Sequence, residues 1–349
     1  MSDALIVGDG VIGLATALAI ARAGGSCRIL GRTVPGAASA ASAGLLAPSI
    51  GSADPVFRSF MIASRDLYPA WLHWLAERTG IEVTLNRRGI IELGANTKAN
   101  GVESTRGEHL AHNALQALEP AIAPTDASLH PTDGYVDNVR LLAALQEAVR
   151  CEWSIEVVEG RASGIEPGID GCTVTTEDGR TQRASCVILA AGAWSALISG
   201  APRPIPVEPV RGQMLQLAGA PLSHAVSAPD AYLVPRGDST LVGSTLERVG
   251  FDSSTTSPAL EHLRAAACAV VPEFTGARVE RAWAGLRPMT PDGLPVLGRD
   301  PDLPSVIYAC GHAKNGILLA PITAECIAAE VAGSTAPMPI DAFRVQRFV

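Results

Sequence analysis

The chain has 349 residues and a formal net charge of −8; 47% of its residues are hydrophobic and 18% are charged. This length allows two or three domains with large cores, and the composition excludes a disordered tail or a fibrous repeat. An acidic chain without a basic stripe is a poor partner for nucleic acid, because phosphate binding needs clustered cations.

The cysteines and the apolar runs bear on redox compartment and membrane association. The seven cysteines are scattered, with no C-x-x-C pair, so neither a metal site nor a disulfide framework is expected. Reduced cysteines favour a cytoplasmic protein. The start of the chain has no signal-peptide pattern. The longest apolar runs, 11–21 and 317–322, are shorter than about 18 residues, so no membrane span is expected.

A βαβ unit is predicted at the start of the chain. Residues 4–7 are typical of a buried parallel strand, 14–23 of an Ala/Leu-rich helix, and 27–30 of a second strand. Between strand and helix stands Gly8-x-Gly10-x-x-Gly13, in which Gly8 permits a tight turn, Gly10 lets backbone approach a pyrophosphate, and Gly13 allows close helix packing. The pattern favours dinucleotide binding at the helix N-terminus; the alternative is a tight turn without a ligand.

The second predicted strand lacks an expected acid. An Asp or Glu near its end would bind the adenosine ribose, but Gly31 and Arg32 follow instead. Either Arg32, a backbone group or water takes over, or the cofactor binds more weakly. Arg32 also leaves NADP open, because an arginine there can accommodate a 2′-phosphate.

Small residues dominate 37–48, where they would let a flat ligand lie against the backbone; a close-packed helix start explains them equally well. Apolar residues at helical spacing predict a long helix over 54–79, with its aromatics in the core. Residues 81–136 are mixed, with a strand-like 89–93 and a turn-rich 124–134. Asp137 is expected to cap a helix over 139–149.

The rest of the chain is predicted to contain elements of the first domain and elements of another domain. Residues 174–176 and 186–189 are predicted as strands of the first domain, and 207–217, 231–235, 240–244 and 279–284 as strands of another, with a helix over 257–271. A strand over 306–309 and a helix over 316–332 end the series. Elements of dinucleotide-binding type thus occur at the beginning, middle and end, which predicts two interleaved domains.

Three later stretches carry candidate chemistry. Residues 186–195 form a buried strand that ends in small residues, which suits passage beside a cofactor or a plain turn. Arg287 stands among apolar and small residues, so it needs an anion: a substrate carboxylate held bidentately, or an internal salt bridge. His312 and Lys314 lie in a polar loop before an apolar helix, where free N–H groups would stabilise negative charge on a flavin ring. A histidine such as His312 is by itself more often a structural residue than a base. The sequence leaves open whether Lys314 is exposed to solvent.

Together these stretches resemble the FAD-dependent D-amino-acid oxidase family, and within it the glycine oxidase branch. The resemblance is carried by G-D-G-V-I-G (8–13), A-S-A-A-S-A-G-L-L-A-P (38–48), A-Y-L-V-P-R (231–236), W-A-G-L-R-P-M-T-P-D-G (283–293), G-H-A-K-N-G-I-L-L-A-P (311–321) and A-F-R-V-Q-R (342–347). It implies an α/β fold in which a Rossmann-like FAD-binding domain (1–84, 137–203 and 284–349) is interleaved with a substrate domain on a mixed β-sheet (85–136 and 204–283).

The resemblance also implies the site. Arg287 would pair with the substrate carboxylate, Tyr232 would help through its hydroxyl, and Lys314, where glycine oxidases usually carry arginine, would contact the substrate. Non-covalent FAD is implied, because no cysteine precedes the Thr-Pro-Asp segment at 290–292. The implied FAD contacts are Gly8, Gly10, Val11, Ile12, Gly13, Gly31, Arg32, Ala38, Ser39, Ala43, Gly44, Leu45, Ala162, His312, Lys314, Asn315, Gly316, Ile317 and Leu318.

The activity implied by the resemblance is oxidation of glycine or an N-substituted glycine. Hydride would pass from Cα to flavin N5, the imine would hydrolyse to glyoxylate and an amine, and O₂ would reoxidise the flavin, giving H₂O₂. The first alternative is a D-amino-acid oxidase or dehydrogenase of the same fold. An NADP-dependent reductase, a tRNA-modifying amine oxidase and a non-catalytic flavin-binding module are further alternatives. A homo-oligomer is compatible with the chain.

Overall fold

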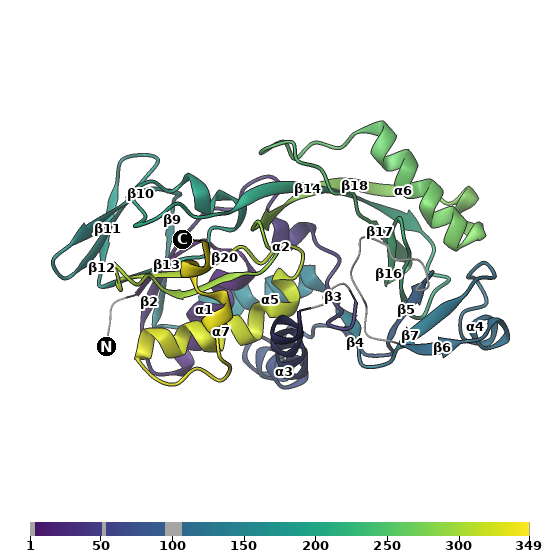
Figure 1. The fold of residues 1–349 in the computed structure, drawn as a ribbon, viewed down its shortest axis with the longest axis horizontal. Coiled ribbons are helices and arrows are strands. Elements are labelled where there is room, and N and C mark those ends of the chain that lie inside the picture. The colour runs from purple at the N-terminus through teal and green to yellow at the C-terminus, as the bar shows by residue number, and fades with distance from the viewer. Residues whose placement is uncertain (1–3, 51–53, 95–106, 349) are drawn as a thin grey trace.

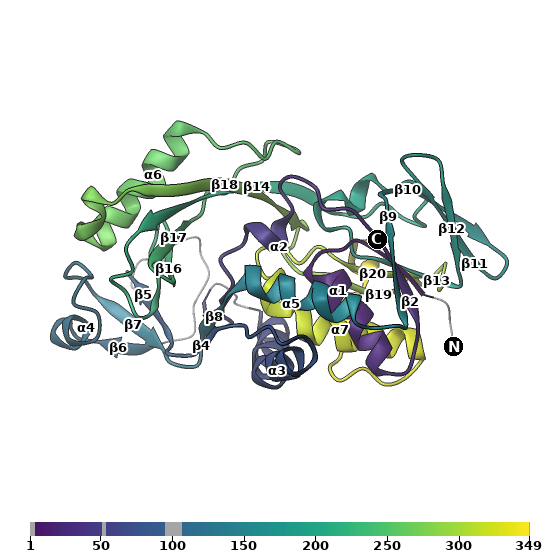
Figure 2. The same cartoon turned by 180° about the vertical axis from the view of Figure 1, so that it is seen from behind.

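The computed structural model describes residues 4–50, 54–94 and 107–348. Its first large sheet is mostly parallel and lies in one half of the molecule (Figures 1 and 2). The strands follow the order β19 (Val296–Arg299), β20 (Val306–Cys310), β13 (Cys186–Leu189), β1 (Ala4–Val7), β2 (Cys27–Gly31) and β9 (Ile155–Glu159). Only β19 runs antiparallel to its neighbour. The apolar runs of β1, β13 and β20 are fully buried, as expected for strands covered on both faces.

Alternate residues of β1 enter two different cores. Ala4 and Ile6 face the helices α1 (Val11–Arg22), α3 (Pro55–Thr79), α5 (Asn138–Arg150) and α7 (Gly316–Ala332). Leu5 and Val7 face a separate antiparallel sheet of β10 (Ala162–Gly168), β11 (Gly171–Thr176) and β12 (Thr181–Ala184). The strand predicted at 174–176 is the end of β11, which lies in this separate sheet rather than in the first large sheet. In β11 inward and half-exposed residues alternate, so it packs one face against the main sheet instead.

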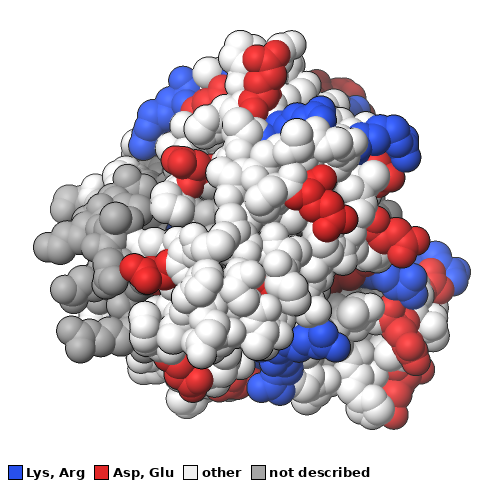
Figure 3. Space-filling model, turned by 90° about the vertical axis from the view of Figure 1, so that its right-hand side faces the viewer, with Lys and Arg blue, Asp and Glu red and all other residues white. Residues whose placement is uncertain are grey.

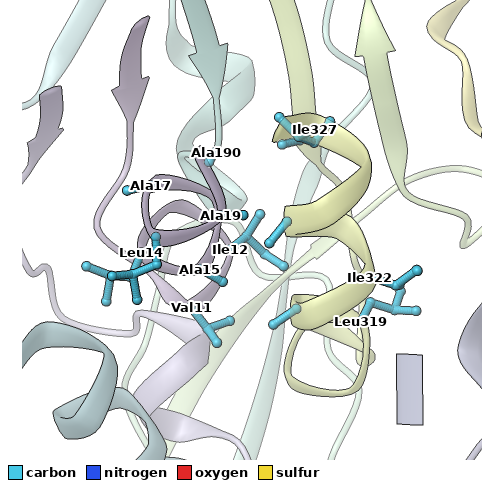
Figure 4. Packing of buried hydrophobic residues seen from close by; sticks show 14 of the residues in the cluster. Val11, Ile12, Leu14, Ala15, Ala17, Ala19, Ala190, Leu319, Ile322 and Ile327 are labelled. Carbon is cyan, nitrogen blue, oxygen red and sulfur yellow. The ribbon is translucent and has the colours of Figure 1, made fainter. Parts of the chain in front are cut away.

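Helices α1 and α7 lie side by side beneath the first sheet (Figure 4). Small residues such as Ala15 and Ala19 on α1 let the two helices approach closely, and Ile12 and Ile322 add apolar bulk to the same core. Gly13 brings α1 against the strand before it, because a Cβ at this position would lie 1.9 Å from the Gly8 carbonyl oxygen. The start of α1 is thereby fixed at the end of β1.

The second large sheet is mixed and curves through the other half of the molecule (Figure 1). Its order is β18 (Val279–Met289), β14 (Glu208–Ala218), β17 (Ser239–Gly243), β16 (Tyr232–Arg236), β15 (Ala225–Ser227), β5 (Ile90–Leu93), β7 (Ala127–His130) and β6 (Glu108–Leu110). Its one parallel pair among the described residues is β15 with β5. The predicted turn-rich segment 124–134 contains β7, because its turn-forming residues flank a short strand rather than replace it. The two sheets confirm the predicted interleaved α/β fold.

Shorter elements complete the described chain. Helix α6 (Ser257–Val270) packs on β14 and β17, and α4 (His112–Leu118) lies beside β6. The small elements between the two halves are α2 (Ala38–Ala41), β3 (Leu45–Leu46), β4 (Leu85–Asn86) and β8 (Gly134–Val136), and the 3-10 helices are η1 (Gly192–Leu197), η2 (Pro272–Gly276), η3 (Asp341–Phe343) and η4 (Val345–Phe348).

The surface and the helix lengths add two observations. On the face shown in Figure 3, acidic and basic side chains are interspersed and neither sign forms an extended patch.

Within the described ranges, every helix is too short or too polar to cross a lipid bilayer.

A proline in α7 explains a contact between α3 and α7. Pro321 has no N–H, so the carbonyl of Ile317, four residues earlier, loses its helical partner. The buried hydroxyl of Tyr68 on α3 donates to that carbonyl, and the Ser64 hydroxyl donates to the Leu318 carbonyl at 2.6 Å. Burial raises the pKa of Tyr68 well above its ordinary value, which keeps the hydroxyl a donor. Helix α3 thereby holds the first turn of α7 in place.

This contact predicts a measurable cost. Tyr68→Phe leaves a buried carbonyl without a donor and is expected to lower the free energy of unfolding by about 1–3 kcal/mol in urea denaturation. In a Pro321→Ala background the backbone N–H of residue 321 replaces the lost donor, so the same substitution should cost less. An equal cost in both backgrounds would contradict this explanation.

Candidate active site

One pocket of about 940 Å³ connects the start of α1 with the second sheet. Its wall includes the turn after β1, the small residues of α2, the segment after β13, the centre of β14, the C-terminal part of β18, and the loop before α7. These segments are far apart in the sequence, and they meet because each stands where a strand ends or crosses between the two halves. The volume is in the range of small-molecule and cofactor sites.

The structure brings nearly all of the predicted site residues to this pocket. Gly13 and Leu318 are the two that do not line it. Gly13 faces the Gly8 carbonyl, as described above, and Leu318 has its side chain in the hydrophobic core. The predicted residues that line the pocket are Gly8, Gly10, Val11, Ile12, Gly31, Arg32, Ala38, Ser39, Ala43, Gly44, Leu45, Ala162, Tyr232, Arg287, His312, Lys314, Asn315, Gly316 and Ile317.

The glycine-rich turn and the small-residue stretch form one end of the pocket. Gly8 has a φ of +121°, and a Cβ there would lie 2.4 Å from the Ala190 carbonyl oxygen, so only glycine fits. The Ser39 hydroxyl accepts a hydrogen bond from the Val11 backbone N–H at 3.0 Å, which fixes α2 at the N-terminus of α1. None of the residues in α2 is buried, although all of them line the pocket. This favours a ligand over a close-packed helix start as the reason for the small residues.

Arg287 lies at the other end of the pocket, on β18. Its guanidinium donates to the Thr245 carbonyl at 3.0 Å and to the Ser244 hydroxyl. The acids that follow these residues in the chain, Glu247 and Asp252, pair with Arg211 instead. No carboxylate among the described residues forms an ion pair with Arg287. The structure thus contradicts the alternative of an internal salt bridge in this part of the chain, and Arg287 retains its charge for an anion from outside.

Tyr232 and Lys314 add to the same end of the pocket. Tyr232 lies on β16 opposite Gly243, and its hydroxyl has a weak contact of 3.6 Å with the Met214 sulfur. Lys314 lines the pocket and is exposed, which answers the question that the sequence left open. Burial and, secondarily, the charge of Arg287 lower the pKa of Lys314. Two neighbouring cations without a carboxylate partner among the described residues make this end of the pocket suited to an anion.

His312 contributes structure rather than charge. Its ring nitrogen Nε2 lies 3.1 Å from the Thr323 hydroxyl of α7. Complete burial lowers the pKa of His312 to about 3, so the ring is neutral at ordinary pH. The alternative of a structural histidine therefore holds for the side chain, and the loop from 311 to 317 lines the pocket around it.

Comparison with known proteins decides the family. The model of the FAD dependent oxidoreductase family matches residues 3–330. The chain belongs to this family. The bifunctional protein ThiO/ThiG of Synechocystis sp. is 34% identical over 362 residues, which cover 100% of this chain and 54% of that protein. Glycine oxidase of Pseudomonas putida is 32% identical over 347 residues, with 92% of each chain covered.

Solved structures of FAD-dependent oxidoreductases agree with the fold. The crystal structure of glycine oxidase from Geobacillus kaustophilus is 30% identical and superposes with a TM-score of 0.91 over 100% of this chain and 99% of that one. The iminodiacetate oxidase of Chelativorans sp. has a TM-score of 0.86 at 22% identity, which shows the fold alone. The chain spans about half the length of the bifunctional relatives that it matches, at 52–55%.

The residues at the α1 end of the pocket fit the FAD of this family. The N-terminus of α1 and the exposed small residues of α2 leave backbone accessible to a pyrophosphate. Glycine at 8 and 10 keeps side chains out of the same place: a Cβ on Gly10 would come within 3.2 Å of the Ser39 hydroxyl. When bound, FAD would have its pyrophosphate held by this part of the pocket.

The structure also reveals site residues that the sequence reasoning missed. Gly212 on β14 makes room for Arg287, because a Cβ there would lie 2.1 Å from the guanidinium. Asn138 donates from its side-chain amide to the Ser39 carbonyl at 3.0 Å, and Arg236 donates to the Ala43 carbonyl at the same distance. A glycine inside a predicted strand indicates close approach by another group, and this signal could have identified Gly212.

Proposed function

We propose that this FAD-dependent oxidoreductase oxidises glycine or a glycine with a substituent on its nitrogen. The observation that carries the proposal is Arg287, a pocket-lining guanidinium that pairs with no carboxylate among the described residues. A guanidinium binds a carboxylate through two parallel hydrogen bonds, which fixes both position and orientation. The relatives named glycine oxidase, at about 32% identity, support the same substrate class.

The residues around the substrate act by positioning it. Arg287 is itself held by the Thr245 carbonyl and the Ser244 hydroxyl, so a bound carboxylate has a fixed place. Tyr232 offers a hydroxyl with no strong partner, and Lys314 adds a second positive charge. Holding the substrate by its carboxylate presents Cα and the amine in one orientation, and such positioning contributes several kcal/mol to catalysis.

Bound FAD supplies the two-electron acceptor that the described side chains lack. Removal of two electrons and two protons from the Cα–N bond of the substrate gives an imine. Water converts the imine to glyoxylate and to ammonia or a primary amine. With O₂ as final acceptor, the two electrons and two protons leave as H₂O₂.

The surroundings of Arg287 support an apolar substituent on the substrate nitrogen. The pocket wall contributed by the second sheet includes Ile90, Met214 and Val226, and Ile50 lines it from the segment after β3. Ile90 and Met214 belong to a small apolar cluster against which Ile50 packs, and Val226 belongs to a larger apolar cluster of the same sheet. Burying a methyl or longer alkyl group there would add about 0.8 kcal/mol per methylene. A secondary amine such as an N-alkylglycine thus fits this wall better than a charged side chain does.

The test is an anaerobic absorption spectrum of the holoprotein with glycine, sarcosine, N-butylglycine or D-alanine in separate cuvettes. Bleaching of the flavin by glycine or an N-alkylglycine is the expected result, with faster bleaching for the N-alkyl compounds. Recolouring within seconds of admitting air would identify O₂ as acceptor. Fastest bleaching by D-alanine would favour the D-amino-acid alternative, and bleaching by none of the four would contradict the proposal.

The same sample tests how FAD is attached. The cysteine that lines the described pocket is Cys310, whose thiol is buried with its pKa raised to about 12. Such a thiol is a poor nucleophile. We therefore expect acid precipitation to leave all of the flavin in the supernatant.

A further inference from the structure

The end of β2 has an unusual neighbour in the first turn. A Cβ on Gly31 would lie 2.4 Å from the Cβ of Asp9 and 2.7 Å from its carboxyl carbon. The Asp9 side chain therefore occupies the space that a side chain at position 31 would need. Both residues line the pocket at its α1 end. A carboxyl group thus stands at the end of the second strand, although it comes from the glycine-rich turn after the first.

In dinucleotide-binding sheets an acid at the end of the second strand receives the adenosine ribose, whose hydroxyls donate hydrogen bonds to it. This chain has glycine at that position and an acid in the turn that faces it. We propose that Asp9 supplies the ribose-binding carboxylate for FAD, and that Gly31 is the reciprocal change that makes room for it. The acid is relocated between two loops that touch, rather than lost.

The surroundings of Asp9 favour ribose hydroxyls as its ligand. No cation among the described residues forms an ion pair with this carboxyl, and its hydrogen-bond partners are its own backbone N–H and the Thr33 side chain. Arg32 reaches instead toward Glu177, at 3.8 Å, where both side chains are about half exposed. A 2′-phosphate would meet an unpaired carboxylate, so this arrangement disfavours NADP. Partial burial raises the pKa of Asp9 and outweighs the opposing effect of these two hydrogen bonds.

The experiment measures binding of FAD and of FMN to the apoprotein by quenching of flavin fluorescence. FMN lacks the whole AMP half of FAD, so it reports only the part of the site that holds the flavin ring, the ribityl chain and the first phosphate. Asp9→Asn keeps the shape of the side chain but removes its charge. It is expected to weaken the binding of FAD by about 10–100-fold and to leave the binding of FMN unchanged. Gly31→Glu alone should weaken FAD as well, because two carboxylates then compete for one space.

The double variant, Asp9→Gly with Gly31→Glu, returns the acid to the second strand and is expected to bind FAD within about threefold of the parent chain. Equal weakening of FAD and FMN by Asp9→Asn would overturn the proposal, since Asp9 would then only shape the turn. A double variant no better than Gly31→Glu alone would overturn it too. These affinities involve no amine substrate, so their outcome is independent of the activity proposed above.

Discussion

Replacing Arg287 with leucine is expected to lower kcat/KM for the amine substrate by about 10²–10⁴-fold and to leave FAD binding unchanged. Each hydrogen bond to a charged group contributes about 1.5–3 kcal/mol, and the guanidinium offers a carboxylate two of them. Leucine retains apolar volume between β14 and the 244–245 loop, so the fold should persist. Steady-state kinetics with the best amine substrate, together with a flavin titration of the apoprotein, measures both effects.

A matched control lies on the same strand. Arg281 is exposed and stacks over the Trp283 ring at 4.9 Å, outside the pocket. Arg281→Leu removes the same charge from β18 and should change kcat/KM by less than about twofold. Arg287→Lys keeps the charge but loses the planar guanidinium, so its kcat/KM should lie between those of the two leucine variants. A loss of less than about tenfold in Arg287→Leu would contradict the bidentate carboxylate site.

Lys314→Met is expected to raise KM for the amine substrate by about 10–100-fold, because one charged hydrogen-bond donor to the carboxylate is lost. The charge of Lys314 also gives a pH dependence. Burial and Arg287 lower the pKa of Lys314, and only its protonated form attracts a carboxylate. Substrate affinity should therefore fall as the pH rises through this lowered pKa. KM measured between about pH 7 and about pH 10 will show this as an alkaline rise below the usual lysine range.

Lys314→Arg separates charge from titration. The guanidinium remains protonated across the whole range, so the alkaline rise in KM should vanish while substrate binding at neutral pH persists. Lys314→Met should lack the rise as well, but with weak binding throughout. If both variants keep the pH profile of the parent chain, another group titrates and Lys314 does not contact the substrate.

Local patterns predicted the parts of the fold that depend on neighbouring residues. The first strand, the glycine-rich turn and α1 follow from contiguous residues, and the structure places helix α3 within a residue of the predicted 54–79. The placement of β11 in a separate sheet was not predictable in this way. A short alternating strand shows that one face is buried but does not name the sheet that covers it.

The site could be predicted only in part, for the same reason. The motif around Arg287 and the loop with Lys314 identified those two residues, but no local pattern showed that Glu247 and Asp252 pair with Arg211 and leave Arg287 free. The absent acid after β2 was noticed from the sequence. Its relation to Asp9 was not, because the two residues meet only through the geometry of the turn.

Strands β14 and β18 have a consequence for how substrate enters. They pair from Glu208 opposite Met289 to Leu217 opposite Val279, with one register shift between Gln216 and Leu217. The far end of β18 is bonded into the cofactor-binding half, where the Leu286 N–H donates to the Gly36 carbonyl and the Pro288 carbonyl accepts from the Ala313 N–H. A rotation of the halves against each other would break these two backbone hydrogen bonds, so we expect the proposed carboxylate site and the proposed FAD site to keep their relative positions. Exchange of substrate and product is then expected to rely on shorter movements of the segments that line the pocket, without opening of one half away from the other.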